Sequence, residues 1–282
     1  MSAPTLPLDS AVVTTKEDSS PVVVFDDVAL AFAGNEVLRG VSFRLARGET
    51  KALFGIAGSG KSLILKLVLG LIRPDSGRIV ALGHDVSQMR EEDLFQLRGK
   101  IGMVFQESAL FDSLTVRENV AYRLMEEHGI YDEEIDGRVR EALRFVELEH
   151  TLELDPSELS GGMRRRVAIA RAIITQPELL LYDSPTGGLD PVTSNTIIEL
   201  IVKQRDVNKT SALLVTHRLQ DAFTMATHQF DKEANRMVAL PPGQHCEVPL
   251  SFLILRDGKV IFDGDLRALT QTQDEYIREY IS

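Results

Sequence analysis

Eight residues, Gly55–Ser62, constrain the fold of this chain more than any other part of its sequence. They read GIAGSGKS and match G-x-x-x-x-G-K-[ST], with an apolar strand expected at 50–54 before them and an apolar helix at 62–71 after them. Glycines let the backbone turn tightly and point successive N–H groups at a phosphate, and the positive end of the helix adds to the attraction. Lys61 can reach the outer phosphates, and the Ser62 hydroxyl can bind Mg²⁺. Since motif and context agree, we expect a nucleotide-binding loop here rather than an ordinary glycine-rich turn.

The charge and the cysteine content exclude other classes of protein. The 282 residues include 31 basic and 42 acidic side chains, for a formal net charge of −11. Such a surface does not suit nonspecific binding to DNA, RNA or an anionic membrane, although one local anion site remains compatible with it. Cys246 is the single cysteine, so an internal disulfide framework and a cysteine-based zinc site are both excluded.

The first 20 residues are expected to form a flexible tail. They are rich in Ser, Thr, Pro and Asp, and they lack the basic segment and apolar core of a secretory signal. No stretch of the chain reaches the roughly 18 apolar residues of a membrane span. We therefore expect residues 21–282 to form the ordered domain, and any membrane role to depend on a partner chain.

Strand patterns flank a helical middle part. Residues 22–32 and 37–45 carry β-branched and aromatic residues around Gly34-Asn35, which predicts an antiparallel pair. The apolar runs at 178–182 and 211–216 are typical of buried strands, the first of them parallel. Asp257-Gly258 predicts a hairpin between 251–255 and 259–263.

The middle part, about 107–172, is charge-rich and reads as an inserted helical subdomain. In the helix expected at 132–148, Ile135, Val139, Leu143 and Val146 recur at helical spacing and form one apolar stripe. A polar insertion at about 229–249 contains prolines and has no chemical interpretation from sequence.

A second set of motifs follows the phosphate loop. Leu159-Ser-Gly-Gly-Met163 precedes a helix expected at 164–174, so it is another anion-binding helix end and a separate site. The strand at 178–182 leads to Asp183, a natural partner for Mg²⁺. Gly188-Leu-Asp190 follows, and His217 comes after the next strand.

With these motifs the sequence resembles the ATP-binding cassette (ABC) ATPases over about residues 22–270. The Walker A loop is Gly55–Ser62, the Q-loop residue is Gln106, and the signature is LSGGM at 159–163. The Walker B strand LLLYD ends at Asp183, the D-loop is GGLD at 187–190, and the switch histidine is His217. The resemblance implies an α/β fold: a P-loop NTPase (RecA-like) core with an antiparallel β subdomain and the inserted helical subdomain.

The resemblance also implies a mechanism in which two copies face head to tail. Each ATP, with Mg²⁺, then lies between the Walker A loop of one copy and the signature of the other. The resemblance implies that the nucleotide is contacted by Phe32, Gly55, Gly58, Ser59, Gly60, Lys61, Ser62, Leu63, Ser160, Gly161, Gly162 and Asp190. The implied metal ligands are Ser62, Gln106 and Asp183. The implied catalytic positions are Gln106, Ser184 and His217. Two of these have structural alternatives, since Phe32 also fits a core strand residue and a lone histidine such as His217 is often structural.

One departure from the family pattern concerns catalysis. The family has a glutamate after the Walker B aspartate that acts as general base, and this chain has Ser184. A serine hydroxyl cannot take up a proton at neutral pH. Three hypotheses remain open: a slow but adequate ATPase in which Gln106 and His217 place the water, an ATP-binding switch with almost no hydrolysis, and an engineered substitution.

Two features resemble one branch of the family, the ATPases of Mla/Mce-type phospholipid transport systems. They are Met163, where most members have Gln, and the stretch ALFDSLTVRENV at 109–120. The resemblance implies an MlaE-type permease, whose coupling helix the region after Gln106 would receive, and an MCE-domain lipid-binding protein as partners. It also implies a peripheral location at the cytoplasmic face of the inner membrane, and no nucleic-acid partner.

Alternatives remain open at this point. The stretch after Gln106 also fits simple packing of the helical subdomain, and other importers share parts of it. Ser184 also fits a regulatory subunit that pairs with a second ATPase. The basic run at 164–166 lies on the helix after the signature, where the family also carries basic residues, so the resemblance does not favour a nucleic-acid site.

Overall fold

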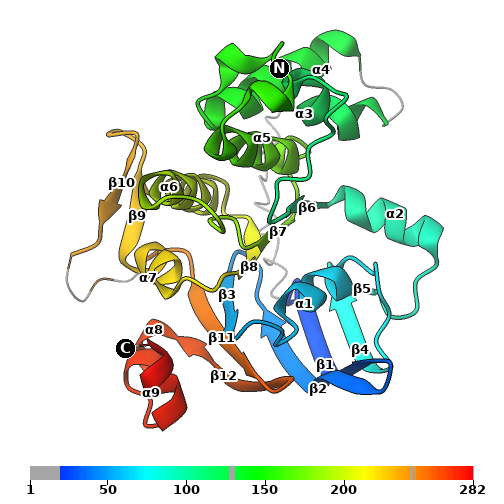
Figure 1. The fold of residues 1–282 in the computed structure, drawn as a ribbon, viewed down its shortest axis with the longest axis vertical. Coiled ribbons are helices and arrows are strands. Elements are labelled where there is room, and N and C mark those ends of the chain that lie inside the picture. Colours follow the sequence, from blue (N-terminus) through cyan, green and yellow to red (C-terminus); the bar gives the residue numbers. More distant parts are fainter. Residues whose placement is uncertain (1–19, 127–130, 242–243, 245, 282) are drawn as a thin grey trace, which may run out of the picture.

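The structure is a computed structural model that describes residues 20–126, 131–241, 244 and 246–281. Of the tail expected at residues 1–20, all except Ser20 lies outside the described residues. Two sheets with helices around them make up most of the described part (Figure 1). None of the helices in this part is long and apolar enough to cross a membrane.

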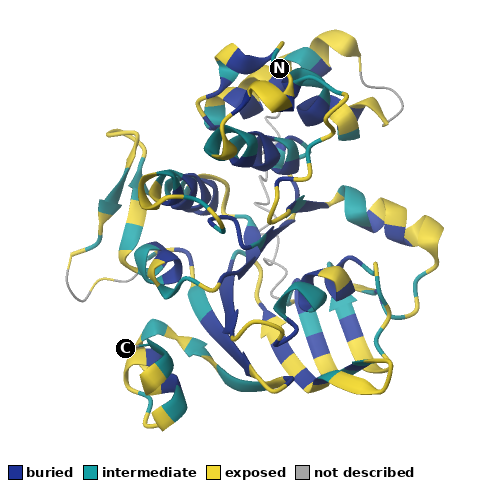
Figure 2. Cartoon of the chain, in the orientation of Figure 1, coloured by how far each residue is buried: buried dark blue, intermediate teal, exposed yellow. Residues whose placement is uncertain are grey.

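A six-stranded sheet forms the centre of the molecule. Its strand order is β12-β11-β3-β8-β7-β6, and all neighbours pair in parallel except β12 with β11. The strands are β3 (Thr50–Gly55), β6 (Ile101–Val104), β7 (Leu179–Asp183), β8 (Ser211–Val215), β11 (Leu250–Arg256) and β12 (Lys259–Asp265). Every residue of β3 and β8 is buried, as Figure 2 shows in dark blue, because helices or the second sheet cover both faces. The buried strands and the hairpin predicted for this sheet are thereby confirmed.

Alternate residues of β7 belong to two separate hydrophobic cores. In β7, Leu179 and Leu181 belong to one hydrophobic cluster, and Leu180 and Tyr182 belong to another. The first cluster packs the sheet against α1 (Lys61–Val68) and the second sheet, whereas the other packs it against α5 (Gly161–Ile173) and α6 (Pro191–Asn208). A continuous apolar run is therefore required, since neither face of the strand meets water.

The second sheet is antiparallel, with strand order β2-β1-β4-β5. It consists of β1 (Val23–Phe32), β2 (Asn35–Leu45), β4 (Ser76–Ala81) and β5 (His84–Asp85). The predicted antiparallel pair is confirmed as β1 and β2, whose turn at Ala33-Gly34 uses positive φ at both residues. The sequence did not reveal β4 and β5.

The remaining helices are α2 (Glu91–Gly99), α3 (Val116–Met125), α4 (Asp132–Phe145), α7 (Leu219–Thr227), α8 (Leu266–Thr270) and α9 (Glu275–Ile281), with short 3₁₀ turns at Glu149–Thr151 and Pro156–Glu158. Helices α3, α4 and α5 share one hydrophobic cluster and lie together at the top of Figure 1. The apolar stripe predicted on α4 is buried there. The boundaries of the helical subdomain at 107–172 stay a prediction.

The insertion at 229–249 contains a hairpin that the sequence did not reveal. Strands β9 (His228–Asp231) and β10 (Arg236–Ala239) pair with each other and lie against α6. Two carboxylates of α6 hold them, because Asp206 accepts from the Phe230 N–H and Glu199 from the Met237 N–H, both at 2.7 Å. Side-chain contacts from a neighbouring helix, rather than local propensity, define this hairpin.

Tyr182 offers a test of the packing around β7. Its side chain is 1% exposed, and its hydroxyl has no hydrogen-bond partner among the described residues. Burial also raises the pKa of this hydroxyl, so it stays protonated. A buried polar group without a partner costs about 1–3 kcal/mol, so we expect Tyr182→Phe to raise the free energy of unfolding by up to about 1 kcal/mol. Urea unfolding measures this, with the exposed Tyr122→Phe as a neutral control; a clear loss of stability in Tyr182→Phe would contradict the account.

Candidate functional site

The loop between β3 and α1 has a backbone shape that requires glycine. Gly58 and Gly60 have φ angles of 79° and 95°. A Cβ atom on Gly60 would lie 2.7 Å from Leu38 Cδ2, and one on Gly55 would lie 2.5 Å from the Leu255 carbonyl oxygen. The loop can therefore lie close to the strands beside it, and the N-terminal end of α1 opens onto it as an anion-binding helix end does.

Lys61 lies across this loop. Its Nζ donates to the carbonyl oxygens of Gly55 and Ile56, both at 2.8 Å, and to Ser59 Oγ at 3.4 Å. Burial lowers the pKa of Lys61, and the nearby Asp183 carboxylate partly opposes that shift. Phosphate oxygens form stronger, charge-assisted hydrogen bonds than neutral carbonyls do. A bound phosphate would therefore compete well for this ammonium group.

Ser62 and Asp183 bring α1 and β7 together at one point. The Ser62 hydroxyl donates to Asp183 Oδ1 at 2.9 Å. A hydroxyl and a carboxylate are oxygen ligands of the kind that Mg²⁺ prefers, and Mg²⁺ commonly takes its remaining ligands from phosphates and water. No group of three or more His, Cys, Asp or Glu side chains suited to a metal occurs in the part of the chain that the structure describes. The pair thus fits a metal ion that arrives with a nucleotide.

Ser184 has a fixed and strained backbone. Its φ is 47°, in the left-handed region, and its N–H donates to the Val215 carbonyl oxygen at 2.8 Å. Its own carbonyl oxygen accepts from the Gly187 N–H at 2.9 Å and from Arg165 Nη1 at 3.3 Å. Both backbone polar groups are therefore used, so the position of the side chain follows from the fold.

Arg165 links three segments of the site from the signature helix α5. Besides Ser184, its guanidinium donates to the carbonyl oxygens of Phe105 at 3.3 Å and Gly187 at 3.4 Å. The side chain is 5% exposed, and burial lowers its pKa. Phe105 precedes Gln106, so one buried cation holds the backbone beside both the Q-loop glutamine and the position of the missing glutamate.

A buried carboxylate ties the segment after β7 to the segment that carries His217. Asp221 is 4% exposed; it accepts from the hydroxyls of Thr186 and Thr216, the latter at 3.3 Å, and forms an ion pair with Arg218 at 3.6 Å. His217 itself is exposed at the end of β8. The two loops are therefore joined below the surface at which the histidine is presented.

The signature lies at the start of α5, against the start of α6. The Ser160 hydroxyl accepts from the Met163 N–H at 3.2 Å and caps α5. A Cβ atom on Gly162 would lie 2.5 Å from Thr193 Cγ2, so glycine allows this close approach. Asp190 caps α6 by accepting from the Thr193 N–H at 3.0 Å. Hydrogen bonds from Thr193 lower the pKa of Asp190 and keep it ionised.

The predicted site residues thus fall into two groups. At the loop and the carboxyl ends of the central parallel strands lie Gly55, Gly58, Ser59, Gly60, Lys61, Ser62, Leu63, Gln106, Asp183, Ser184 and His217; at the starts of α5 and α6 lie Ser160, Gly161, Gly162 and Asp190. Phe32 stands apart at the end of β1, 46% exposed.

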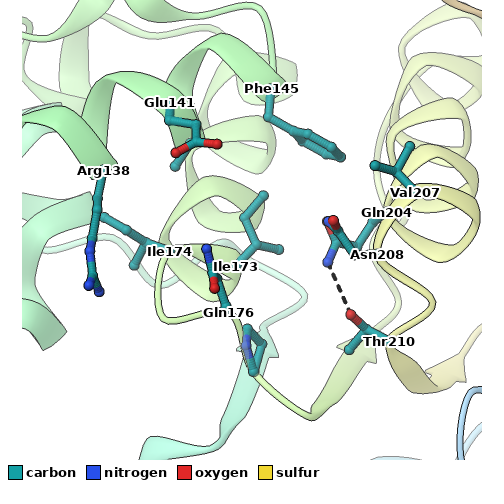
Figure 3. Close-up of a pocket in the computed structure, with 12 residues that line it drawn as sticks. Arg138, Glu141, Phe145, Ile173, Ile174, Gln176, Gln204, Val207, Asn208 and Thr210 are labelled. Carbon is teal, nitrogen blue, oxygen red and sulfur yellow. Dashed lines mark hydrogen bonds between the residues drawn. The ribbon is translucent and has the colours of Figure 1, made fainter. Parts of the chain in front are cut away.

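A pocket of about 460 Å³ lies away from both groups, between α4 and the ends of α5 and α6 (Figure 3). Phe145 and Val207 form part of its apolar wall. Its amides bond within the pocket, since Gln204 donates to Thr210 Oγ1 at 3.4 Å and accepts from Asn208 Nδ2 at 2.7 Å. None of the predicted site residues lines it. Gln204, Asn208 and Thr210 on its α6 side are therefore bonded to one another.

The geometry of loop, Ser62 and Asp183 at the end of a parallel sheet defines a P-loop nucleoside triphosphatase. Residues 38–187 match the family model described as ABC transporter. A solved structure of a dimeric ATP-binding cassette, in a post-hydrolysis state bound to ADP and Pi, aligns with a TM-score of 0.72 and 28% identity, over 87% of this chain and 99% of that chain. The chain therefore belongs to the ABC transporter family, as an ATP-binding cassette subunit. The predicted family and α/β fold class are confirmed.

Curated relatives extend the likeness along most of the chain. The protein TRIGALACTOSYLDIACYLGLYCEROL 3 of Arabidopsis thaliana is 34% identical over 273 residues, which is 94% of this chain and 74% of that protein. The intermembrane phospholipid transport system ATP-binding protein MlaF of Escherichia coli K12 is 31% identical over 255 residues, covering 90% and 86%. A methionine import ATP-binding protein, MetN of Bifidobacterium longum, is 37% identical over 227 residues, covering 78% of this chain but only 56% of its own length. ABC ATPases bind ATP and couple its hydrolysis to transport, and that general activity applies to this chain.

The basic side chains at 164–166 turn toward the protein backbone, which the sequence alone does not show. Beside Arg165, Arg164 donates to the Leu159 carbonyl oxygen at 2.6 Å and Arg166 to that of Val146 at 3.1 Å. All three guanidinium groups bind backbone carbonyls of this chain. The sequence shows three consecutive cations on one helix, but it does not show which way each side chain points.

We expect Arg165→Gln to lower the rate of ATP hydrolysis at saturating ATP by about tenfold or more, because small displacements of catalytic groups are costly. Phosphate release by the purified protein measures the rate, and nucleotide titration checks that binding survives. Arg166→Gln is the matched control, since it removes a partly buried bond within the helical part only. Equal losses in both variants would contradict a special role for Arg165.

Proposed function

We propose that this chain is the ATPase subunit of a phospholipid transport system of the Mla type. The observation that carries the proposal is the likeness to MlaF along nearly the whole length of both proteins. Met163 in the signature and the stretch at 109–120 support the same branch. Methionine import is the second candidate, favoured by the higher identity of MetN, but those alignments leave over two fifths of MetN without a counterpart.

In the proposed mechanism, two copies bind two ATP molecules between the loop of one copy and the signature of the other. Lys61 moves from the loop carbonyls to the phosphates, and Ser62 and Asp183 hold Mg²⁺. Ser160, Gly161 and Gly162 contact the γ-phosphate across the dimer, and Phe32 stacks on the adenine. The dimeric state of the solved relative supports this arrangement.

Five exposed apolar side chains near Gln106 form what we call the permease-facing patch: Phe95, Phe105, Phe111, Tyr122 and Met125, each 39–59% exposed. Two of its members stack, with the Phe111 and Tyr122 rings 4.7 Å apart, and the guanidinium of Arg123, the residue after Tyr122, lies 4.5 Å from the centroid of the Phe95 ring. Exposed apolar residues gathered in one place mark interaction surfaces. We assign this patch to the coupling helix of an MlaE-like permease.

A buried asparagine holds the loop that carries part of this patch. Asn119 is 0% exposed; its Oδ1 accepts from the Phe111 N–H at 2.8 Å, and its Nδ2 donates to the carbonyl oxygens of Phe111 and Leu114. Thr115 and Glu118 form a capping box at the start of α3. The loop is thus pre-organised, which lowers the entropic cost of docking a partner.

The experiment that tests the proposal is purification of the tagged chain with its partners from membranes of the source organism. Mass spectrometry of the complex then identifies the permease, and extraction identifies bound lipids. An MlaE-like permease, an MCE-domain protein and phospholipid, at the cytoplasmic face of the inner membrane, support the proposal. A methionine-importer permease would replace it with the second candidate.

The same purification tests the patch. We expect Tyr122→Ala to reduce recovery of the permease by about tenfold or more, the effect of losing about 1.4 kcal/mol of interface energy. Tyr131→Ala is the matched control, because this tyrosine is 80% exposed at the start of α4 and lies outside the patch. Nucleotide binding by both variants should equal that of the parent chain. Undiminished recovery with Tyr122→Ala would exclude this surface.

We further propose that hydrolysis is slow because Ser184 stands where the family has its general base. Phosphoryl transfer depends mainly on positioning and charge stabilisation, so Gln106 and His217 can sustain a low rate by placing the water. The alternative is a switch that binds ATP with almost no hydrolysis.

Replacing Ser184 with glutamate tests the proposal that this position makes hydrolysis slow. We expect Ser184→Glu to increase phosphate release by at least about tenfold, since a positioned general base contributes about 10²–10⁴-fold. Ser184→Ala is the control that removes the hydroxyl without adding a base, and it should change the rate little. If Ser184→Glu gave no gain, this position would not limit the rate. A parent rate at background level would favour the switch.

A further inference from the structure

The C-terminal helix α9 touches the phosphate loop from the opposite end of the sequence. The Tyr280 hydroxyl oxygen accepts a hydrogen bond from the Gly55 N–H at 3.3 Å. The Gly55 carbonyl oxygen accepts from Lys61 Nζ at 2.8 Å. Both backbone polar groups of the residue at which the chain leaves β3 are therefore held, from two directions.

Helix α9 is anchored on the strand that leads into the loop. Ile277 is 1% exposed and shares a hydrophobic cluster with Phe54, the residue before Gly55. Tyr276 and Tyr280 stack with ring centroids 6.1 Å apart, and the guanidinium of Arg256 covers the Tyr276 ring at 4.0 Å. The helix thus reaches the loop from a packed position rather than from a free end.

Gly55 has little room to adjust on its own. It is buried, its φ is 150°, and the space of a Cβ atom is taken by the Leu255 carbonyl oxygen and by Ser59 Oγ at 2.6 Å. Without the Tyr280 hydroxyl, the N–H of the buried Gly55 would lose this hydrogen bond, which is unfavourable. The Gly55 N–H can find another partner only if the backbone at the start of the loop moves. Such a movement would also displace the loop amides that must point at the phosphate.

We propose that Tyr280 is a positioning residue for nucleotide binding, whose hydroxyl lets the docked C-terminal helix fix the path of the phosphate loop. Tyr280 is not among the residues that the mechanism places at the metal ion or the water. Its loss should therefore weaken binding and leave the chemical step largely unchanged. The proposal rests on nucleotide binding by the loop and is independent of the cargo and of Ser184.

The test compares two isosteric deletions on the same helix. Tyr280→Phe removes the hydroxyl that meets Gly55, and Tyr276→Phe removes one for which no hydrogen bond to the loop exists among the described residues. Calorimetric titration with MgADP reports loop binding in a single chain, without formation of the ATP sandwich. We expect Tyr280→Phe to raise the Kd for ADP about threefold to tenfold, the effect of one hydrogen bond, and Tyr276→Phe to change it less than about twofold.

Two further readouts separate positioning from loss of structure. Tyr280→Phe should raise the KM for ATP while kcat stays within about twofold, and amide exchange of the segment around Gly55 should become faster. An unchanged Kd in Tyr280→Phe overturns the proposal. So does an equal rise in both variants, which would assign the effect to docking of α9 rather than to the hydroxyl.

Discussion

The hydrogen bond between Ser62 and Asp183 is the contact on which the rest of the site depends. It joins the first turn of α1 to the carboxyl end of β7, two elements separated by 121 positions in the sequence. The parallel pairing of β7 with β8, and of β8 with β3, sets the distance between them. A Mg²⁺ ion that arrives with a nucleotide would take both oxygens as ligands, so the order of strands in the sheet brings its two protein ligands together.

Around this contact the loops are held by buried polar groups that do not themselves meet the nucleotide. Arg165 binds the backbone at Phe105, Ser184 and Gly187, and Asp221 ties Thr186 to the segment of His217. Such networks are stable only when nearly all of their members are paired, because a lone buried charge is costly. Arg165 therefore links the backbone at Phe105, beside Gln106, to the backbone at Ser184 and Gly187. In the proposed function, this shared contact is the physical basis for coupling the permease-facing patch to the site.

Sequence patterns predicted the parts of the molecule that follow local rules. The glycine pattern of the loop, the all-apolar run of β7 and the hairpin at Asp257-Gly258 each depend on neighbours in the chain, so they were found. The hairpin at β9 and β10 was not found, because Asp206 and Glu199 on α6 hold it. The contact from Tyr280 to Gly55 spans 225 positions and depends on how α9 packs. No local pattern encodes such a contact, nor the inward turn of the basic run on α5.

The backbone of Ser184 also depends on contacts with residues that are distant in the sequence. Its left-handed backbone is set by Val215, Gly187 and Arg165, all of which bind its main chain and none its side chain. A non-glycine residue in this region pays a cost of about 1–2 kcal/mol whatever its side chain is. The main chain at this position is therefore set by the fold and does not depend on which side chain it carries. A glutamate introduced here, as in the test of slow hydrolysis, would have the same backbone partners available.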